Sequence, residues 1–129
     1  MVGGRELIEL DFDKGHGFIP VVAQDFKTGE VLMLAYMNQL AWKETLKTGY
    51  AHYWSKSRNR LWKKGEVSGN MQEVKEIRVD CDSDCILIKV YQIGDAACHK
   101  GYRSCFYRKV MGNSLIEDGE RIFDPEEKY

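Results

Sequence analysis

The sequence lacks any long hydrophobic run. None of its apolar stretches approaches the length of about eighteen residues that a membrane-spanning helix needs, and the N-terminal segment MVGGRELIELDFD has neither the basic nor the apolar region of a secretory signal peptide. We therefore expect a cytoplasmic protein without membrane association. With 129 residues, of which 43% are hydrophobic and 30% charged, the chain is expected to form one globular domain, residues 1–129.

The chain also lacks a strong net charge. A formal charge of −1 at pH 7 argues against a general nucleic-acid binder, because such proteins neutralise phosphates with many cations. The charge is nevertheless uneven, since residues 117–129 carry six acids against two bases and are expected to form a solvated surface segment. There is no internal repeat, no low-complexity linker and no regular alternation of strands and helices.

The four cysteines lack the paired CxxC spacing of a zinc ribbon or finger. In a reducing compartment, disulfides between Cys81 and Cys85 or between Cys98 and Cys105 are less favoured than metal ligation. Three thiolates without an obvious fourth ligand would leave one coordination position for water, as at a catalytic zinc. Cys85 could compete for that position, but it leads into the apolar run at residues 86–88 and is read as a small buried hydrophobe.

Three aspartates, at positions 80, 82 and 84, directly follow a β-like run that ends at Val79. In an extended chain, residues two apart project to the same side, so the three carboxylates should share one face and Cys81 should lie on the other. Such a cluster is costly unless a cation neutralises it, and oxygen ligands suit hard ions such as Mg²⁺. The segment therefore predicts two different metals.

A basic run without an intervening acid precedes this region. It consists of Lys56, Arg58, Arg60, Lys63 and Lys64. The run could be a solvated loop, but hydroxyls and glycine backbone groups surround it, which suits a small phosphate site. These neighbours are Ser55, Ser57, Gly65, Ser68 and Gly69. Because five bases do not make a long nucleic-acid track, we expect a phosphorylated small molecule as the ligand.

The local patterns predict an α+β fold with mostly antiparallel strands and one main helix. Phe18–Asp25 and Val31–Tyr36 flank a turn with Gly29, which favours a hairpin. A helix is expected over Gln39–Thr48, between an N-cap at Asn38 and Gly49, and is expected to pack through Trp42 and Leu46. Further strands are expected over residues 50–54, 74–81, 86–92 and 105–110.

Several motifs then agree in order with one known family. The segments TGEVLMLAYMN, HYWSKSRNRLWKKGEVSGN, DCDSDC and ACHKGYRSCFYR closely resemble those of the phosphoribosyl-AMP cyclohydrolases of histidine biosynthesis, from about Phe18 to Val110. The resemblance implies a metal-dependent hydrolase that uses a zinc-activated water to open the N1–C6 bond of the adenine ring of phosphoribosyl-AMP. It also implies an intertwined homodimer with its sites between the subunits.

The resemblance assigns roles to individual residues. The implied zinc ligands are Cys81, Cys98 and Cys105, with one thiolate from one subunit and two from the other, and the implied Mg²⁺ ligands are Asp80, Asp82 and Asp84. His99 matches a proton carrier, although a metal-bound water is an alternative general acid, whereas His16 and His52 are read as structural. The substrate-binding set comprises Ser55, Lys56, Ser57, Arg58, Lys64, Ser68 and Arg103.

One alternative belongs to a different class of protein. The chain could be a zinc-stabilised module that binds a nucleotide or an RNA end without catalysis, with its thiolates serving only the fold. The aspartate triad argues against it, because a structural zinc site needs four ligands and no carboxylates nearby.

Overall fold

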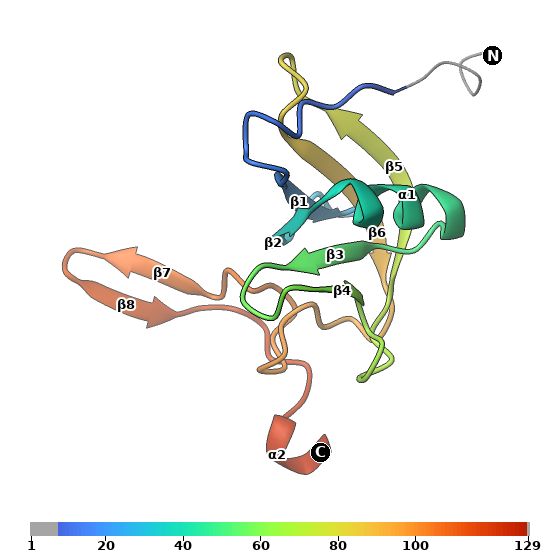
Figure 1. Cartoon of the computed structure of the whole chain (residues 1–129). Coiled ribbons are helices and arrows are strands. Elements are labelled where there is room, and N and C mark those ends of the chain that lie inside the picture. The colour runs from blue at the N-terminus through green and yellow to red at the C-terminus, as the bar shows by residue number, and fades with distance from the viewer. Residues whose placement is uncertain (1–7, 129) are drawn as a thin grey trace.

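The computed structural model describes residues 8–128, so residues 1–7 of the N-terminal stretch and Tyr129 at the end of the acidic tail lie outside the described part (Figure 1). Its elements are β1 (Ile19–Asp25), β2 (Val31–Met37), α1 (Gln39–Thr48), β3 (His52–Ser55), β4 (Arg60–Lys63), β5 (Gln72–Val79), β6 (Ile86–Gln92), β7 (Arg108–Met111), β8 (Ser114–Glu117) and α2 (Pro125–Lys128). In this part of the chain, no helix combines the length and apolar character needed to cross a membrane.

The central sheet has the strand order β2-β1-β6-β5. It consists of two antiparallel hairpins, β1–β2 and β5–β6, which join through the parallel pair β1–β6. β3 and β4 form a second sheet, and β7 and β8 form a third. The predicted α+β class with mostly antiparallel strands is thereby confirmed.

The core lies on one face of the central sheet. Burial alternates along β1 and β6, as period-two side-chain placement requires, and side chains of α1 and β3 complete the core cluster. The largest contributions come from Ile19, Val21, Leu32, Met37, Trp42, Tyr53, Ile86, Ile88 and Val90.

Helix α1 has the predicted bounds. The Asn38 side chain accepts a hydrogen bond from the backbone N–H of Ala41 at 2.9 Å, and Gly49 adopts a left-handed φ of 78° at the other end. These two caps satisfy backbone groups that the helix itself leaves unpaired.

The packed face of α1 differs from the prediction. Trp42 is buried, but Leu46 is 47% exposed, and Thr45 is buried in its place. The Thr45 hydroxyl accepts a hydrogen bond from the backbone N–H of His52 at 2.9 Å and donates one to the carbonyl of Ala41. The hydrogen bond between Thr45 and β3 therefore helps to fix which face of the helix is buried.

The remaining strands correct three expectations. The basic run contains a strand, β4, which pairs with β3 so that Trp62 lies opposite Tyr53. The strand expected from Cys105 begins only at Arg108, because the backbone N–H of Cys105 donates to the carbonyl of Leu32 in β2 instead. The strand β8 was not predicted.

The acidic tail is exposed, as expected, but it is held to the body. The backbone N–H of Arg103 donates to the carbonyl of Glu120 at 2.8 Å, and the N–H of Ile122 donates to that of Gly101 at 2.6 Å. These bonds fix the chain that follows β8 against the loop at residues 101–103.

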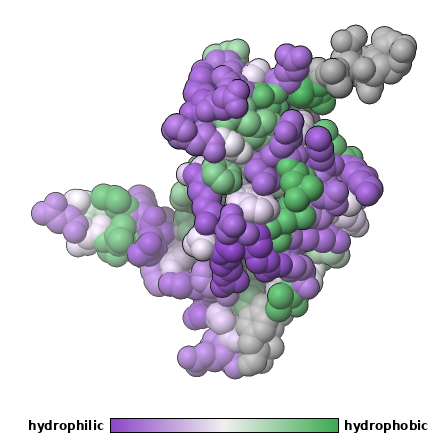
Figure 2. Space-filling view, viewed as in Figure 1, coloured by the Kyte–Doolittle hydropathy of each residue, from purple (hydrophilic) through white to green (hydrophobic). Residues whose placement is uncertain are grey.

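The β7–β8 hairpin projects away from the rest of the molecule (Figure 1). The space-filling view shows hydrophobic residues on this projection (Figure 2). We call residues 108–117 the arm.

A buried ion pair links the β1–β2 turn to the loop before the arm. The Asp25 carboxylate accepts hydrogen bonds from the backbone N–H groups of Thr28 and Lys27, at 2.8 and 3.1 Å, and lies 3.0 Å from the Arg103 guanidinium, which also contacts Glu30. Burial by itself would raise the pKa of Asp25, but the two N–H groups and the positive charge of Arg103 outweigh burial and lower it.

We predict that Asp25→Asn lowers the free energy of unfolding at pH 7 by about 2–4 kcal/mol, because it removes the buried anion that pairs with Arg103 and accepts the N–H groups of the turn. The folded-state pKa of Asp25 is depressed, so its contribution is complete above the unfolded pKa of about 4 and is lost as the pH falls through the folded value. Urea unfolding at several pH values should show the difference between wild type and variant shrinking below about pH 4. The exposed Asp118→Asn is the control, and a difference that stays constant to pH 3 would contradict the interpretation.

Candidate functional site

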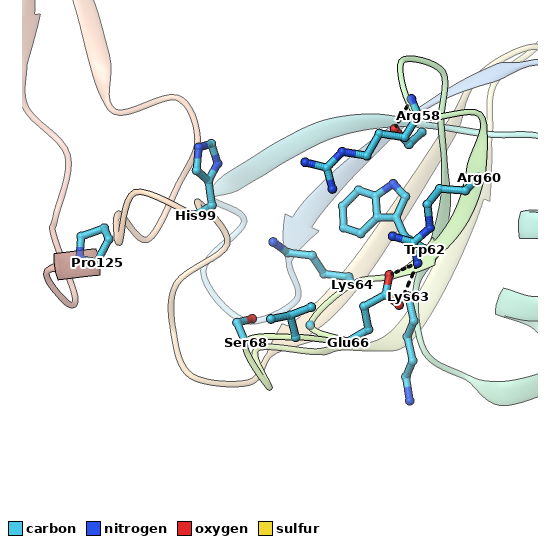
Figure 3. Close-up of a pocket in the computed structure, with 12 residues that line it drawn as sticks. Arg58, Arg60, Trp62, Lys63, Lys64, Glu66, Ser68, His99 and Pro125 are labelled. Carbon is cyan, nitrogen blue, oxygen red and sulfur yellow. Dashed lines mark hydrogen bonds and ion pairs between the residues drawn. The ribbon is translucent and has the colours of Figure 1, made fainter. Parts of the chain in front are cut away.

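A pocket of about 640 Å³ lies beside the β3–β4 hairpin. This hairpin and the loop after β4 form one wall, and His99 and Pro125 lie across the opening (Figure 3). The lining residues are Ser55, Arg58, Arg60, Trp62, Lys63, Lys64, Gly65, Glu66, Val67, Ser68, His99 and Pro125. The lining therefore contains four Arg or Lys residues and one acid.

The structure brings together part of the predicted substrate set. Ser55, Arg58, Lys64 and Ser68 line the pocket, and so does the predicted proton carrier His99.

Three residues of that set do not line the pocket. The Lys56 ammonium lies 3.8 Å from the ring centroid of Tyr36 and 4.9 Å from that of Phe18, a cation–π arrangement outside the lining. Ser57 lies near Ser55 but is not part of the wall, with 3.4 Å between the hydroxyl oxygens. Arg103 is held by its ion pairs instead.

Trp62 is one of the lining residues that sequence reasoning missed, together with Glu66, Val67 and Pro125. It is half-buried, and its ring centroid lies 5.2 Å from that of the fully buried Tyr53, which fixes one side of the indole against the core. In Figure 3 the indole stands in the wall between Arg58 and Lys64. The sequence held a signal for this residue: Arg60, Trp62 and Lys64 alternate along the chain, and residues two apart on a strand share a face. This pattern would have placed Trp62 beside the two bases.

One ion pair organises the outer part of the wall. The Arg60 guanidinium donates to both carboxylate oxygens of Glu66 at 3.1 Å. Glu66 neutralises Arg60, and the Lys63 ammonium points away from the pocket, 4.8 Å from the ring centroid of Tyr50 (Figure 3). Arg58 and Lys64 are therefore the lining cations that remain for a ligand.

The loop after β4 depends on Gly65. This residue has φ +87°, and a Cβ there would lie 2.5 Å from the backbone carbon of Asn70 and the nitrogen of Met71. Gly69 has a similar φ of +83°, but a Cβ there would meet nothing within 4 Å. The loop therefore needs Gly65 for close backbone approach as well as for conformation.

Two of the predicted zinc thiols lie together behind the pocket. Desolvation by the surrounding protein atoms disfavours the thiolate of Cys105 and raises its pKa to about 11. The neighbouring Cys98 also raises this pKa, whereas the positive charge of Lys64 lowers it. The Lys64 ammonium donates to the carbonyl of Ala97 at 2.5 Å, next to Cys98. Burial of the Lys64 ammonium lowers the pKa of this lysine. A divalent cation would replace the thiol protons and stabilise both thiolates, so the pair fits a metal.

The third predicted thiol lies elsewhere in the same chain. Cys81 is exposed in the turn before β6, whereas Cys98 follows the opposite end of that strand. A seven-residue strand spans roughly 20 Å. Among the described residues, only the three aspartates form a cluster of three potential metal ligands, so one chain does not bring the three thiols together. Cys85 is half-buried.

The three aspartates do converge, with ligand oxygens within 4.8 Å of one another. The prediction of an extended segment is wrong, because β5 ends at Val79 and a turn follows, with Ser83 at φ 61°. One oxygen of Asp80 accepts the backbone N–H groups of Asp84 and Cys85, at 3.0 and 3.1 Å. A hydrogen-bonded turn, and not strand alternation, therefore gathers the carboxylates.

Lys14 lies against this carboxylate cluster. Its ammonium is 3.1 Å from a carboxylate oxygen of Asp82 and 3.1 Å from one of Asp84. The hydrogen bond between the two carboxyls raises the pKa of Asp84 and, with the contact to Lys14, lowers the pKa of Asp82 to about 2. The cluster therefore attracts positive charge, and its all-oxygen ligands fit a hard divalent cation.

In this α+β domain, the pocket offers cations and hydroxyls of the kind that bind a phosphorylated small molecule, and it adjoins a thiol pair. The family model of phosphoribosyl-AMP cyclohydrolase matches residues 33–107. The chain therefore belongs to the phosphoribosyl-AMP cyclohydrolase family, which confirms the enzyme interpretation over the non-catalytic binding module.

Individual relatives support the assignment over nearly the whole chain. A phosphoribosyl-AMP cyclohydrolase of Desulfatibacillum aliphaticivorans is 61% identical over 123 residues, which cover 95% of this chain and 98% of the relative. One from Desulfotalea psychrophila is 57% identical over 124 residues, covering 95% and 98%. One from Methanothrix thermoacetophila is 65% identical over 111 residues, covering 86% and 88%.

The glycine contrast gives a test of the pocket loop. Gly69→Ala should lower the free energy of unfolding by about 1 kcal/mol through its left-handed conformation alone. Gly65→Ala should cost about 1–3 kcal/mol more, because its Cβ must displace the backbone at Asn70. Urea unfolding of the two variants measures this difference directly. Equal losses would show that Gly65 serves only the backbone conformation.

Proposed function

We propose that this protein catalyses the hydrolytic opening of the N1–C6 bond of the adenine ring of phosphoribosyl-AMP, the ring-opening step of histidine biosynthesis. The observation that carries the proposal is the pocket, which combines the cations Arg58 and Lys64 with His99 and lies next to the Cys98–Cys105 pair. Membership of the family supplies the substrate.

The charges of the pocket suit this substrate. Two phosphomonoesters each carry about −1.5 to −2 charges at pH 7. Arg58 offers a side-chain cation to them, and the hydroxyls of Ser55 and Ser68 offer hydrogen bonds. Lys64 lies deeper, between the pocket and the thiols, and is suited to the part of the substrate nearest the reacting ring.

The purine ring is proposed to stack on Trp62. The indole is held in place by Tyr53, whose hydroxyl donates to Gln72 in the core, so the platform is ordered before any ligand binds. Stacking of a base on an aromatic ring is worth about 1–3 kcal/mol. It would place the ring between the cationic wall and His99.

Ring opening requires a proton at N1 as the bond breaks. The imidazole of His99 lines the pocket and can both accept and donate a proton, so we assign it the proton transfer. Since it directly follows Cys98, the thiol pair and the proton carrier share one short loop.

We further propose that Cys98 and Cys105 hold zinc together with the partner subunit's Cys81, in a homodimer. Zinc supplies Lewis-acid activation of water when bound. Asp80, Asp82 and Asp84 are proposed to hold Mg²⁺, with the ammonium of Lys14 giving way to the divalent ion. Cys81 and Cys98 lie beyond opposite ends of β6, and this separation supports a zinc site whose thiolates come from two chains.

Incubation with phosphoribosyl-AMP, followed by ultraviolet absorbance, tests the activity. Cys98→Ala should lose its zinc, measured by elemental analysis, and at least about 99% of the ring-opening rate, because a thiolate ligand is removed. Cys85→Ala is the matched control and should keep both. Retention of one zinc per chain by Cys98→Ala would overturn the ligand assignment, and an inactive wild type with full zinc would overturn the function.

The stacking proposal predicts a graded response at Trp62. Trp62→Leu should raise the KM for phosphoribosyl-AMP by about 5- to 100-fold through the loss of stacking, whereas Trp62→Phe should keep most of the affinity. AMP should quench the fluorescence of the wild type and of the control Trp54→Phe, but much less that of Trp62→Phe. A Trp62→Leu enzyme with an unchanged KM would rule out the platform.

A further inference from the structure

The segment that carries the thiol pair has no helix or strand of its own. We call residues 95–105 the thiol loop; they form turns and bends, with one isolated bridge between Tyr102 and Arg121. Cys98 and Cys105 are separated by six residues of this loop. The distance between the two thiols therefore depends on the contacts that hold the loop to the rest of the molecule.

The side chain of Arg103 makes several of these contacts. Its Nη2 lies 3.0 Å from a carboxylate oxygen of Asp25, and its Nε donates to Glu30 at 2.7 Å, so the loop is joined to the turn between β1 and β2. Its Nη1 lies 3.9 Å from a carboxylate oxygen of Asp95, the first residue of the loop. The Arg103 side chain is only 18% exposed, and salt screens a pair of this kind less than a surface pair.

The backbone on either side of Arg103 is held as well. The carbonyl of Arg103 accepts the backbone N–H of Ala97, next to the first of the two thiols, at 3.0 Å. The backbone N–H of Cys105 donates to the carbonyl of Leu32 at 2.7 Å, two residues after Glu30 in the sequence. One arginine thus connects the backbone before the first thiol with the strand that holds the second.

The surroundings of Arg103 do not suit a substrate phosphate. Arg103 does not line the pocket, and all three of its guanidinium nitrogens face carboxylates. One guanidinium and three carboxylates leave a net negative charge, which repels a phosphate. A guanidinium presents five N–H donors in a rigid planar fork and can serve several acceptors at once. The geometry is that of a cross-link between chain segments.

We propose that Arg103 is a positioning residue, which fixes the separation of the Cys98 and Cys105 thiols before a metal binds. Ligands that are ordered in advance lose less conformational freedom on binding. Residues that hold metal ligands in place contribute about 10- to 100-fold to metal affinity. The inference rests on the thiol pair of the proposed function and assigns Arg103 to the metal centre instead of to the substrate.

The zinc affinity of Arg103 variants tests the proposal. The dissociation constant for zinc, measured by competition with a chromophoric chelator, should rise about 10- to 100-fold in Arg103→Met. Arg103→Lys keeps the charge but not the planar fork, so its dissociation constant should be intermediate. Asp25→Asn should also weaken zinc binding, and it should add little to Arg103→Met, because both changes break the same ion pair.

The matched control is Ile19→Val. Ile19 is fully buried and lies at the opposite end of β1 from Asp25, so this change removes core packing without touching the thiol loop. The control should bind zinc like wild type. A control that loses as much zinc affinity as Arg103→Met would show a general effect of stability and would overturn the proposal, as would wild-type zinc affinity in both Arg103 variants.

A second measurement uses the thiols of one chain without zinc. Phenylarsine oxide forms two As–S bonds with a pair of adjacent thiols and releases water, so its affinity depends on their separation. In a Cys81→Ser/Cys85→Ser background, Arg103→Met should weaken arsenical binding and Ile19→Val should not. Circular dichroism identifies the folded variants, and Arg103→Lys with Asp25→Asn replaces Arg103→Met if the latter does not fold. Unchanged arsenical affinity in the folded variants would contradict the proposal.

Steady-state kinetics at saturating zinc distinguish positioning from substrate binding. Arg103→Met should have a reduced kcat but a KM for phosphoribosyl-AMP within about twofold of wild type, because no substrate contact is lost. A KM raised at least about tenfold, with unchanged zinc affinity, would make Arg103 a substrate ligand and overturn the proposal.

These outcomes also separate Arg103 from the enzyme function. A wild type that does not open the ring refutes the function, whereas the zinc and arsenical affinities still decide the role of Arg103. An active wild type whose zinc and arsenical affinities do not depend on Arg103 refutes the positioning role and leaves the function standing.

Discussion

A buried chain of hydrogen bonds holds the pocket to the central sheet. The Tyr53 hydroxyl donates to Gln72, the Gln72 amide donates to Gln92 at 2.9 Å, and the Gln92 amide donates to the carbonyl of Asn70 at 3.0 Å. All four residues are buried, so loss of one would remove a hydrogen-bond partner from its neighbour at low dielectric. The chain connects β3, β5, β6 and the end of the pocket loop. Trp62 packs against Tyr53, the first residue of this chain of hydrogen bonds.

The strand β6 separates the two groups of predicted metal ligands. The aspartate turn precedes it and the thiol loop follows it, so each end of one strand carries a different ligand chemistry. Because a paired strand cannot shorten, Cys81 stays far from Cys98 and Cys105 within one chain. This spacing accounts for two features of the described residues: an exposed cysteine in a turn, and a thiol pair without a third thiol beside it.

Much of the fold could be predicted from local patterns. The caps of α1 and the turn at Gly29 are short-range signals, and both gave elements where they were expected. The pairing of β4 with β3 could not be predicted in the same way, since it depends on Trp62 meeting Tyr53 nine residues earlier. The positions of Lys56 and Arg103 also depend on distant partners, aromatic rings in one case and Asp25 in the other. The sequence placed both in the predicted substrate set, but neither lines the pocket.

The sequence by itself determined the chemistry of the ligands: three carboxylates, three thiols and a basic run, in an order that matches one family. Residue type decides which ions and phosphates can bind, and residue type is read without a structure. Tertiary structure decided which of these groups meet. It gathered the aspartates through a turn, divided the thiols between the two ends of β6, and selected the cations that face Trp62. Proximity depends on long-range strand pairing and buried hydrogen bonds, which local sequence does not encode.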